Sequence, residues 1–238
     1  MVDKLPPHLK DIFGQALFEC FKHNSKHKLW INNTYGPKEE MPLDVYLRTE
    51  DEMPDLELIA LNNCRGKVLD IGAGAGSHTL IMQDKGLDVT ALDISDLAVT
   101  IMLQRGVKRA IAADIFTYEQ DKYDTLLLMM NGIGLCGTIQ QLRLFLKQTK
   151  TLLNKGGQLL FDSSDIAYLY DGDVPNGESY YGELSYQYVY KGQKTDWFKW
   201  LYIDQEKLKT VAAEEGWLVE VLYEDDMDQY LARLTPVN

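Results

Sequence analysis

The chain has 238 residues, of which 45% are hydrophobic, and its 24 basic and 36 acidic side chains give a formal net charge of −12. That length suits one α/β domain with an appendage, and the apolar content excludes a disordered chain. The acidic balance disfavours nucleic acid and anionic membranes as partners, because both would be repelled on average.

Residues 1–65 form the first predicted segment, an N-terminal helical cap. An amphipathic pattern over about residues 9–23 predicts a helix, and an irregular stretch rich in Pro, Asn and Gly follows. No apolar run is long enough for a membrane span. The three cysteines match no zinc or redox spacing, so we expect a cytoplasmic protein without a metal site.

From residue 67 onward, short apolar runs alternate with helical segments that begin at a capping side chain and end near glycine. Ser and Thr oxygens accept the free N–H groups of a first helical turn, and glycine adopts the left-handed conformation that ends a helix. Helices are predicted from Ser77, Ser95 and Thr138. The strands between them are predicted at residues 67–71, 87–92, 107–112, 123–130 and 158–163. This alternation predicts a parallel sheet with right-handed crossovers.

The C-terminal part adds a helix from Asp204 to Gly216 and two strands, at residues 217–224 and 229–234. Only a few residues join these strands, so they must be antiparallel. The predicted fold is therefore α/β: a doubly wound, mostly parallel seven-stranded sheet whose last strand is antiparallel. It occupies residues 66–238.

An insertion at about residues 165–203 interrupts this domain. Two stretches of alternating polar and apolar residues flank Gly192 and predict an added β-hairpin, at residues 183–191 and 195–203. The hairpin is crowded with Tyr, Trp and Phe. These aromatic residues are interpreted either as a lid over an organic substrate or as ordinary hairpin packing or a homodimer contact. Both the insertion and the N-terminal cap can cover the carboxyl edge of the sheet, where ligands bind in such folds.

A glycine-rich loop follows the first strand of the domain, in the stretch Val-Leu-Asp-Ile-Gly-Ala-Gly-Ala-Gly-Ser that ends at Ser77. Gly72 and Gly74 let the backbone turn tightly and approach a ligand, and Gly76 lets the next helix pack closely. A dinucleotide-binding loop requires glycine where Ser77 stands. The preceding Asp70 would repel a pyrophosphate but attract the ammonium of an amino acid.

These residues resemble the class I, Rossmann-like S-adenosylmethionine-dependent methyltransferases over about residues 67–234. That family has an acidic residue and G-x-G-x-G after the first strand, matched by Asp70 and the loop with Ala73. An acidic residue that ends the second strand binds the ribose hydroxyls in the family, and Asp93 matches it. The resemblance implies S-adenosylmethionine as the cofactor.

The same resemblance assigns further contacts. Ile94 would lie on the adenine face, Asp114 would bind the adenine amino group, and the backbone of Ile115 would contribute beside it. Asp114 is alternatively a helix cap only. Asn131, after the fourth strand, would contact the cofactor's amino group or orient the substrate, or it is a turn residue. The Pro-Pro-aromatic sequence that follows this position in enzymes that methylate adenine or glutamine is absent here.

The acceptor site is less well defined by the sequence. By resemblance to small-molecule methyltransferases with an N-terminal cap, Tyr35 and Arg48 are candidate lining residues, and Asp165 is a third because it begins the insertion. His78 is interpreted mainly as a helix-surface histidine. No general base is identified, so the catalytic residues stay unknown.

The predicted function is in-line transfer of a methyl group from S-adenosylmethionine to an unidentified small molecule. The alternatives are a catalytically silent S-adenosylmethionine-binding protein and an NAD-linked oxidoreductase, and a basic protein substrate is a further possibility. Neither nucleic acid nor a membrane is an expected partner.

Overall fold

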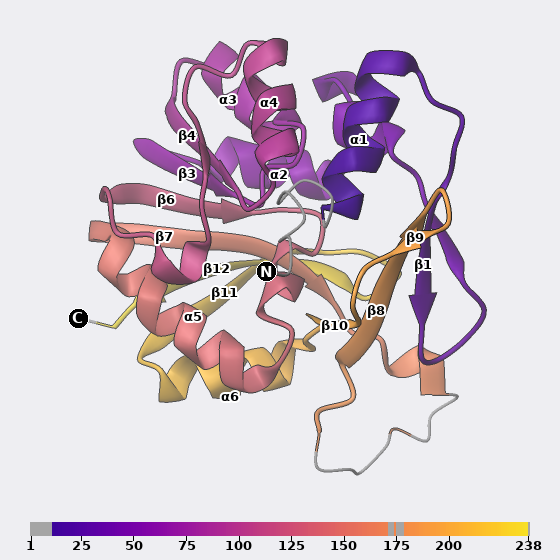
Figure 1. The fold of residues 1–238 in the computed structure, drawn as a ribbon. Coiled ribbons are helices and arrows are strands. Elements are labelled where there is room, and N and C mark those ends of the chain that lie inside the picture. Colours follow the sequence, from indigo (N-terminus) through magenta and orange to yellow (C-terminus); the bar gives the residue numbers. More distant parts are fainter. Residues whose placement is uncertain (1–10, 171–173, 175–178, 238) are drawn as a thin grey trace, which may run out of the picture.

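A computed structural model describes residues 11–170, 174 and 179–237 of the chain (Figure 1). Its larger sheet has seven strands in the order β11-β12-β7-β6-β3-β4-β5. The parallel strands are β3 (Lys67–Ile71), β4 (Asp88–Asp93), β5 (Ala110–Ala112), β6 (Tyr123–Leu128) and β7 (Leu153–Ser164). The last strand, β12 (Gln229–Pro236), runs antiparallel to both β7 and β11 (Trp217–Glu224). The predicted fold class is confirmed.

Helices cover both faces of this sheet. One face packs against α5 (Ile139–Leu152) and α6 (Gln205–Glu214), and the other packs against α2 (Asp55–Asn63), α3 (Ser77–Asp84) and α4 (Asp96–Arg105). Neighbouring strand residues alternate between the two faces, so Leu69 and Leu126 join the α5 core whereas Val68 and Leu127 join the α2 core. Strands buried on both faces explain the nearly continuous apolar runs.

Two predicted strands are shorter in the structure than in the sequence analysis. The third begins only at Ala110, because the Val107 N–H donates to the Met102 carbonyl as part of the end of α4. The fourth ends at Leu128, because Met130 and Asn131 adopt left-handed backbone conformations, with φ of 62° and 54°. The second of these changes makes the chain leave the sheet at the carboxyl end of β6.

A second sheet has five strands and lies beside the carboxyl ends of the parallel strands (Figure 1). The predicted hairpin is present as β8 (Glu183–Tyr190), β9 (Gln193–Lys194) and β10 (Phe198–Leu201). The N-terminal segment adds β1 (Leu29–Asn33) and β2 (Glu39–Met41), and β1 pairs with β8. We call this second sheet the lid sheet.

The N-terminal segment is therefore only partly helical. The predicted helix is present as α1 (Ile12–His23), capped by the Asp11 side chain, but the stretch predicted to be irregular contains the two lid strands. Whether residues 1–65 and 66–238 are separate units stays a prediction. Within the part of the chain that the structure describes, no helix has both the length and the apolar character to cross a membrane.

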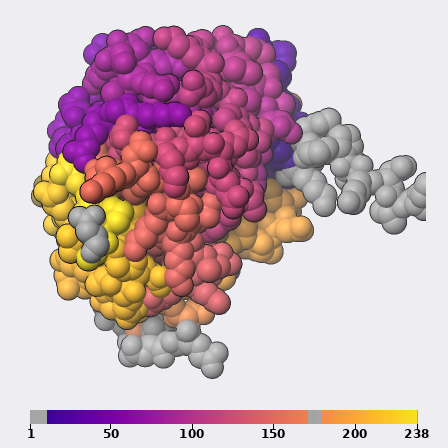
Figure 2. Space-filling model, turned by 90° about the vertical axis from the view of Figure 1, so that its left-hand side faces the viewer, coloured from indigo at the N-terminus to yellow at the C-terminus, as the bar shows by residue number. Residues whose placement is uncertain are grey.

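The two ends of the seven-stranded sheet differ in their surroundings. Figure 2 shows the side of the molecule that lies on the left in Figure 1, where the parallel strands begin. At the carboxyl end, the glycine loop, the strand ends and the lid sheet face one another across a cavity. Functional residues are therefore expected at the carboxyl end.

Candidate functional site

A cavity of about 870 Å³ lies between the carboxyl edge of the seven-stranded sheet and the lid sheet. Its volume is typical of a small-molecule site. Nine of the ten predicted cofactor-binding residues line it, namely Asp70, Gly72, Ala73, Gly74, Asp93, Ile94, Asp114, Ile115 and Asn131. The structure thus brings together side chains from four different strand ends.

The glycine loop lines the cavity with backbone atoms that carry no side chain at its glycines. Gly72 has a φ of +70°, and its N–H and that of Ala73 donate to the Leu92 carbonyl at 2.8 and 3.0 Å. A Cβ added to Gly72 would meet no heavy atom within 4 Å. The space beside this residue is therefore open to a ligand, as a loop that holds a cofactor requires.

Gly76 is the predicted cofactor residue that does not line the cavity. It precedes α3 with a φ of +80°, and a Cβ there would approach Met102 and Val107 to 2.9 Å. Glycine at this position lets α3 pack closely against α4, the structural role that the sequence analysis gave it.

Asp93, at the end of β4, holds the loop in place. Its Oδ2 accepts the Gly74 N–H at 2.8 Å, and its Oδ1 accepts the Ser95 N–H at 2.9 Å. Burial raises the pKa of Asp93 to about 6, against the lowering effect of these two backbone donors. A carboxylate has about four lone-pair sites, so both oxygens can still accept hydroxyl groups from a ligand.

The neighbouring strand ends offer one apolar and one polar surface. The Ile94 side chain is 78% exposed, which is high for an isoleucine that borders a cavity. Asp114 is exposed, and its Oδ1 caps the short helix at Ile115–Thr117 through the Phe116 N–H at 2.9 Å. The capping alternative is therefore present in the structure, but it uses only one carboxylate oxygen.

Asp70 is 2% exposed at the floor of the cavity, and it accepts a hydrogen bond of 2.5 Å from the Thr79 hydroxyl. Desolvation raises the pKa of this carboxyl group, against the charge of His78 and the bonds from Thr79. A buried carboxyl group of this kind binds an ammonium well, because the cation restores the interactions that burial removed.

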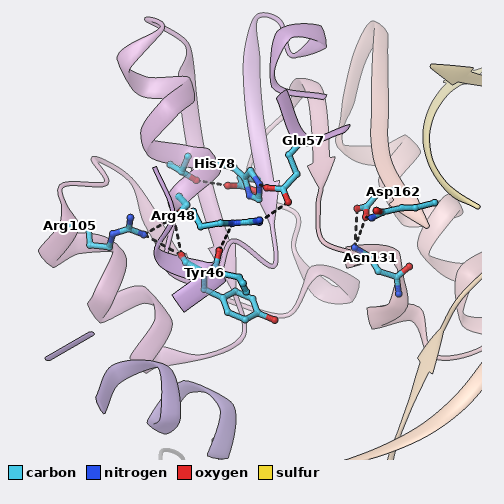
Figure 3. A network of polar contacts seen from close by, with 12 residues as sticks. Tyr46, Arg48, Glu57, His78, Arg105, Asn131 and Asp162 are labelled. Atoms are coloured by element: carbon cyan, nitrogen blue, oxygen red, sulfur yellow. Dashed lines mark hydrogen bonds and ion pairs between the residues drawn. The ribbon is translucent and has the colours of Figure 1, made fainter. Parts of the chain in front are cut away.

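Asn131 is held by the protein on three sides. Its backbone N–H donates to both oxygens of Asp162 at 2.9 and 2.8 Å, and its side-chain amide bonds the Leu201 carbonyl and the Ser163 hydroxyl. Figure 3 shows Asp162 beside it. The amide thus uses one donor and one acceptor within the protein, which supports the turn-residue alternative, although the residue borders the cavity.

Arg48, Glu57 and His78 form a connected network at the cavity (Figure 3). The Arg48 guanidinium donates to Glu57 Oε1 at 2.7 Å, and His78 Nε2 lies 2.7 Å from Glu57 Oε2. The partners lower the pKa of Glu57 despite its burial. The interpretation of His78 as a surface residue is wrong: it is 7% exposed, because the N-terminal part of α2 covers it.

Arg105 of α4 ties the N-terminal segment to the glycine loop (Figure 3). Its guanidinium donates to the carbonyls of Ala75 at 2.7 Å and Leu47 at 3.3 Å, and to the Ser77 hydroxyl at 3.0 Å. It also lies 3.5 Å from the Tyr46 carbonyl. The ring of Tyr46 is thereby placed over the loop.

Replacing Arg105 with alanine is expected to lower the free energy of unfolding by about 2–3 kcal/mol, because several partly buried acceptors lose a charged donor. Urea unfolding measures the change. Lys209→Ala is the control, since the Lys209 ammonium pairs with Glu206 on the exposed face of α6 and that pair is worth less than about 1 kcal/mol. Equal losses in both variants would contradict this role for Arg105.

Two of the predicted substrate-lining residues lie away from the cavity lining. The Tyr35 hydroxyl is 3.3 Å from that of Tyr186, and Asp165 accepts bonds from the Ala167 N–H and the Tyr181 hydroxyl. Only Arg48 of the three borders the cavity. Tyr188, Phe198 and Trp200 also line the cavity, and they belong to the hairpin aromatic residues for which a lid over the substrate is one of the two interpretations. Phe13, Glu39 and Tyr46 are lining residues that the sequence did not predict, because their inward direction depends on contacts between distant segments.

Comparisons with known proteins agree with this geometry. A family model described as a methyltransferase domain matches residues 48–217. The structure is similar to a crystal structure of an S-adenosylmethionine-dependent methyltransferase from Bacteroides fragilis in complex with S-adenosyl-L-homocysteine, with 36% identity and a TM-score of 0.89. That likeness covers 99% of this chain and 98% of the other.

Two further relatives are more distant. An uncharacterised methyltransferase of Staphylococcus carnosus is 38% identical over 63 residues, which span 26% of this chain and 28% of that protein. The CcbJ methyltransferase of Streptomyces caelestis has 14% identity and a TM-score of 0.62, over 82% of this chain and 96% of the other, and shows the fold alone. The family match and the Bacteroides structure together show that the chain belongs to the class I S-adenosylmethionine-dependent methyltransferases.

Proposed function

We propose that this protein transfers the methyl group of S-adenosylmethionine to a small molecule that enters between the strand ends and the lid sheet. The observation that carries the proposal is one continuous cavity, lined by the glycine loop at one side and by the inner face of the lid sheet at the other. Such an enclosed space suits a small acceptor better than a nucleic acid, and so does the negative net charge.

Each chemical group of the cofactor has a suitable partner among the residues that line the cavity. The open space at Gly72 admits the methionine part, and Asp70 is placed to attract its ammonium. Asp93 accepts the ribose hydroxyls, and the exposed Ile94 side chain covers one adenine face. The free carboxylate oxygen of Asp114 and the Ile115 N–H are placed to bind the adenine edge. The role of Asn131 is to fix the turn beside the reacting groups.

Bound S-adenosylmethionine supplies a methyl group on a positively charged sulfur: an electron pair of the acceptor forms the new bond to carbon, and the electrons of the broken C–S bond stay on sulfur. The protein's own contribution is to align the acceptor and to exclude water. Apolar and aromatic side chains of the lid sheet provide the dry surroundings.

The direct test incubates the protein with S-adenosylmethionine carrying an isotope-labelled methyl group and a panel of small molecules, and follows label transfer by mass spectrometry. Methylation of any acceptor above the protein-free control supports the proposal. A protein that binds S-adenosylhomocysteine but methylates nothing in broad panels would instead support the silent binding protein.

Cofactor affinity is expected to depend on pH through Asp93. Ribose hydroxyls donate to the ionised carboxylate, so affinity is full above pH 7 and decreases as the pH falls through about 6, the pKa of Asp93. At pH 5 about one tenth of the carboxyl groups are ionised, and S-adenosylhomocysteine should bind up to about tenfold more weakly. Calorimetry from pH 5 to 8 measures this. An Asp93→Asn variant should lose the part of this dependence that is centred near pH 6, and an equally steep profile in that variant would contradict the assignment.

A further inference from the structure

The inner face of the lid sheet is an aromatic wall. Phe198 pairs with Tyr186, and Tyr188 pairs with Ile31, so these side chains share one face of the sheet. All four line the cavity, together with Trp200, which lies two residues from Phe198 on the same face. The ring centroids of Tyr188 and Phe198 are 5.0 Å apart, and those of Phe198 and Trp200 are 6.4 Å apart.

Glu39 places a carboxylate on this same face. It pairs with Ile31 across β1 and β2, and it lines the cavity. Its Oε1 accepts a bond of 2.9 Å from the Asn33 side chain. Its neighbour Glu40 belongs to the opposite face and pairs there with Lys28.

Among the residues that the structure describes, the positive charges that border the cavity have partners within the protein. The Arg48 guanidinium is paired with Glu57, and the Lys199 ammonium donates to the Glu183 carbonyl at 3.1 Å. Of the acidic residues that line the cavity, three are assigned above to the cofactor, and Asp11 caps α1. Glu39 is thus the lid-sheet carboxylate that can still take a ligand partner.

The phenol groups near Glu39 stay neutral. The hydroxyls of Tyr35, Tyr186 and Tyr202 follow one another at 3.3 and 3.4 Å, and burial raises the pKa of each above its usual value. Neutral rings present electron-rich faces to a cation without adding a charge of their own. An aromatic wall with one carboxylate at its edge is the arrangement that recognises organic ammonium groups.

We propose that the methyl acceptor carries a positively charged amine, bound by the Glu39 carboxylate and by the rings of Tyr186, Tyr188, Phe198 and Trp200. This inference rests on the proposed function, because it assigns the acceptor side of that same cavity. It concerns recognition of the charged group, whichever atom of the acceptor receives the methyl group.

Three probes of nearly equal shape test the charge preference on protein saturated with S-adenosylhomocysteine. They are choline, its neutral carbon isostere 3,3-dimethyl-1-butanol, and the anion 3,3-dimethylbutanoate. Ligand-observed NMR titration measures the three affinities. Choline is expected to bind at least about fivefold more tightly than either of the others, which corresponds to one cation–π contact or exposed charge pair.

Glu39→Gln should reduce the preference for choline over the neutral isostere, because only the aromatic rings then favour the cation, and should leave S-adenosylhomocysteine affinity unchanged. Glu40→Gln, on the opposite face of the same strand, is the matched control and should keep the preference. The inference is overturned if the three probes bind equally, if none of them binds, or if the anion is preferred. It is also overturned if both variants lose the same amount of choline affinity. If S-adenosylhomocysteine binds but choline is not preferred, the acceptor class is wrong while the methyltransferase function is unaffected. Failure of S-adenosylhomocysteine itself to bind would overturn both.

Discussion

Replacing Asp93 with alanine is expected to weaken S-adenosylhomocysteine binding by at least about 100-fold. In the proposed complex the carboxylate accepts two ribose hydroxyls, and a hydrogen bond to a charged group contributes about 1.5–3 kcal/mol, so the expected loss exceeds about 3 kcal/mol. The same substitution releases the Gly74 N–H, which the carboxylate holds at 2.8 Å. Isothermal titration calorimetry on wild type and variant measures the ratio of the two dissociation constants.

Asp88→Ala is the matched control for this experiment. Asp88 begins the same strand at its other end, and its side chain makes only a 3.6 Å surface contact with Arg109. It should therefore keep the wild-type affinity. The assignment is contradicted if Asp93→Ala loses less than about threefold in S-adenosylhomocysteine affinity, or if Asp88→Ala loses a comparable amount. Either result would show that the carboxylate at the end of β4 does not bind the ribose.

Replacing Gly72 with alanine should also abolish most cofactor binding, but for a steric reason. The protein alone has room for the methyl group, since a Cβ there meets no atom within 4 Å. The expected cost to folding is the left-handed conformation of a residue with a side chain, about 1–2 kcal/mol. The added methyl group projects into the space that we assign to the cofactor, so we expect an affinity loss of about 100-fold or more, measured by the same titration.

Gly86→Ala separates strain from steric block. Gly86 follows α3 with a φ of +84°, and a Cβ added to it also meets nothing within 4 Å, but it lies outside the cavity lining. Both variants should lose similar stability in urea unfolding, whereas only Gly72→Ala should lose affinity. Unchanged affinity in Gly72→Ala would mean that the cofactor does not approach this part of the loop.

The cofactor half of the site could be predicted because its signals are local. A buried strand, a glycine turn and a capped helix occupy adjacent residues, and each strand of a parallel sheet ends at the same edge. The family resemblance could therefore assign Asp93 and Asp114 to one site, because both follow strands that end at this edge, and both line the cavity.

The acceptor half could not be predicted in the same way, because it depends on pairing between distant segments. The strand at Leu29–Asn33 has five residues, two of them Asn, and its partner β8 begins at Glu183. Which of its side chains face the cavity follows from that register and not from the local sequence. For this reason Tyr35 was selected as a lining residue and Glu39 was missed.

His78 illustrates a second limit. The pattern of α3 alone suggests a histidine on a helix surface, but α2 supplies Glu57, which lies 2.7 Å from the imidazole. The sequence analysis predicted no helix at Asp55–Asn63, so nothing was available to cover α3. Residues at the junction of two segments are assigned correctly only when both segments are known.

The central claim is that the cavity holds S-adenosylmethionine, and calorimetric titration of the purified wild-type protein with S-adenosylhomocysteine and, in parallel, with NADH tests it most directly. The prediction is one-to-one binding of S-adenosylhomocysteine in the micromolar range and no heat of binding with NADH. Binding of NADH instead, or of neither ligand, would contradict the assignment of the glycine loop, Asp93 and Asp114 to this cofactor.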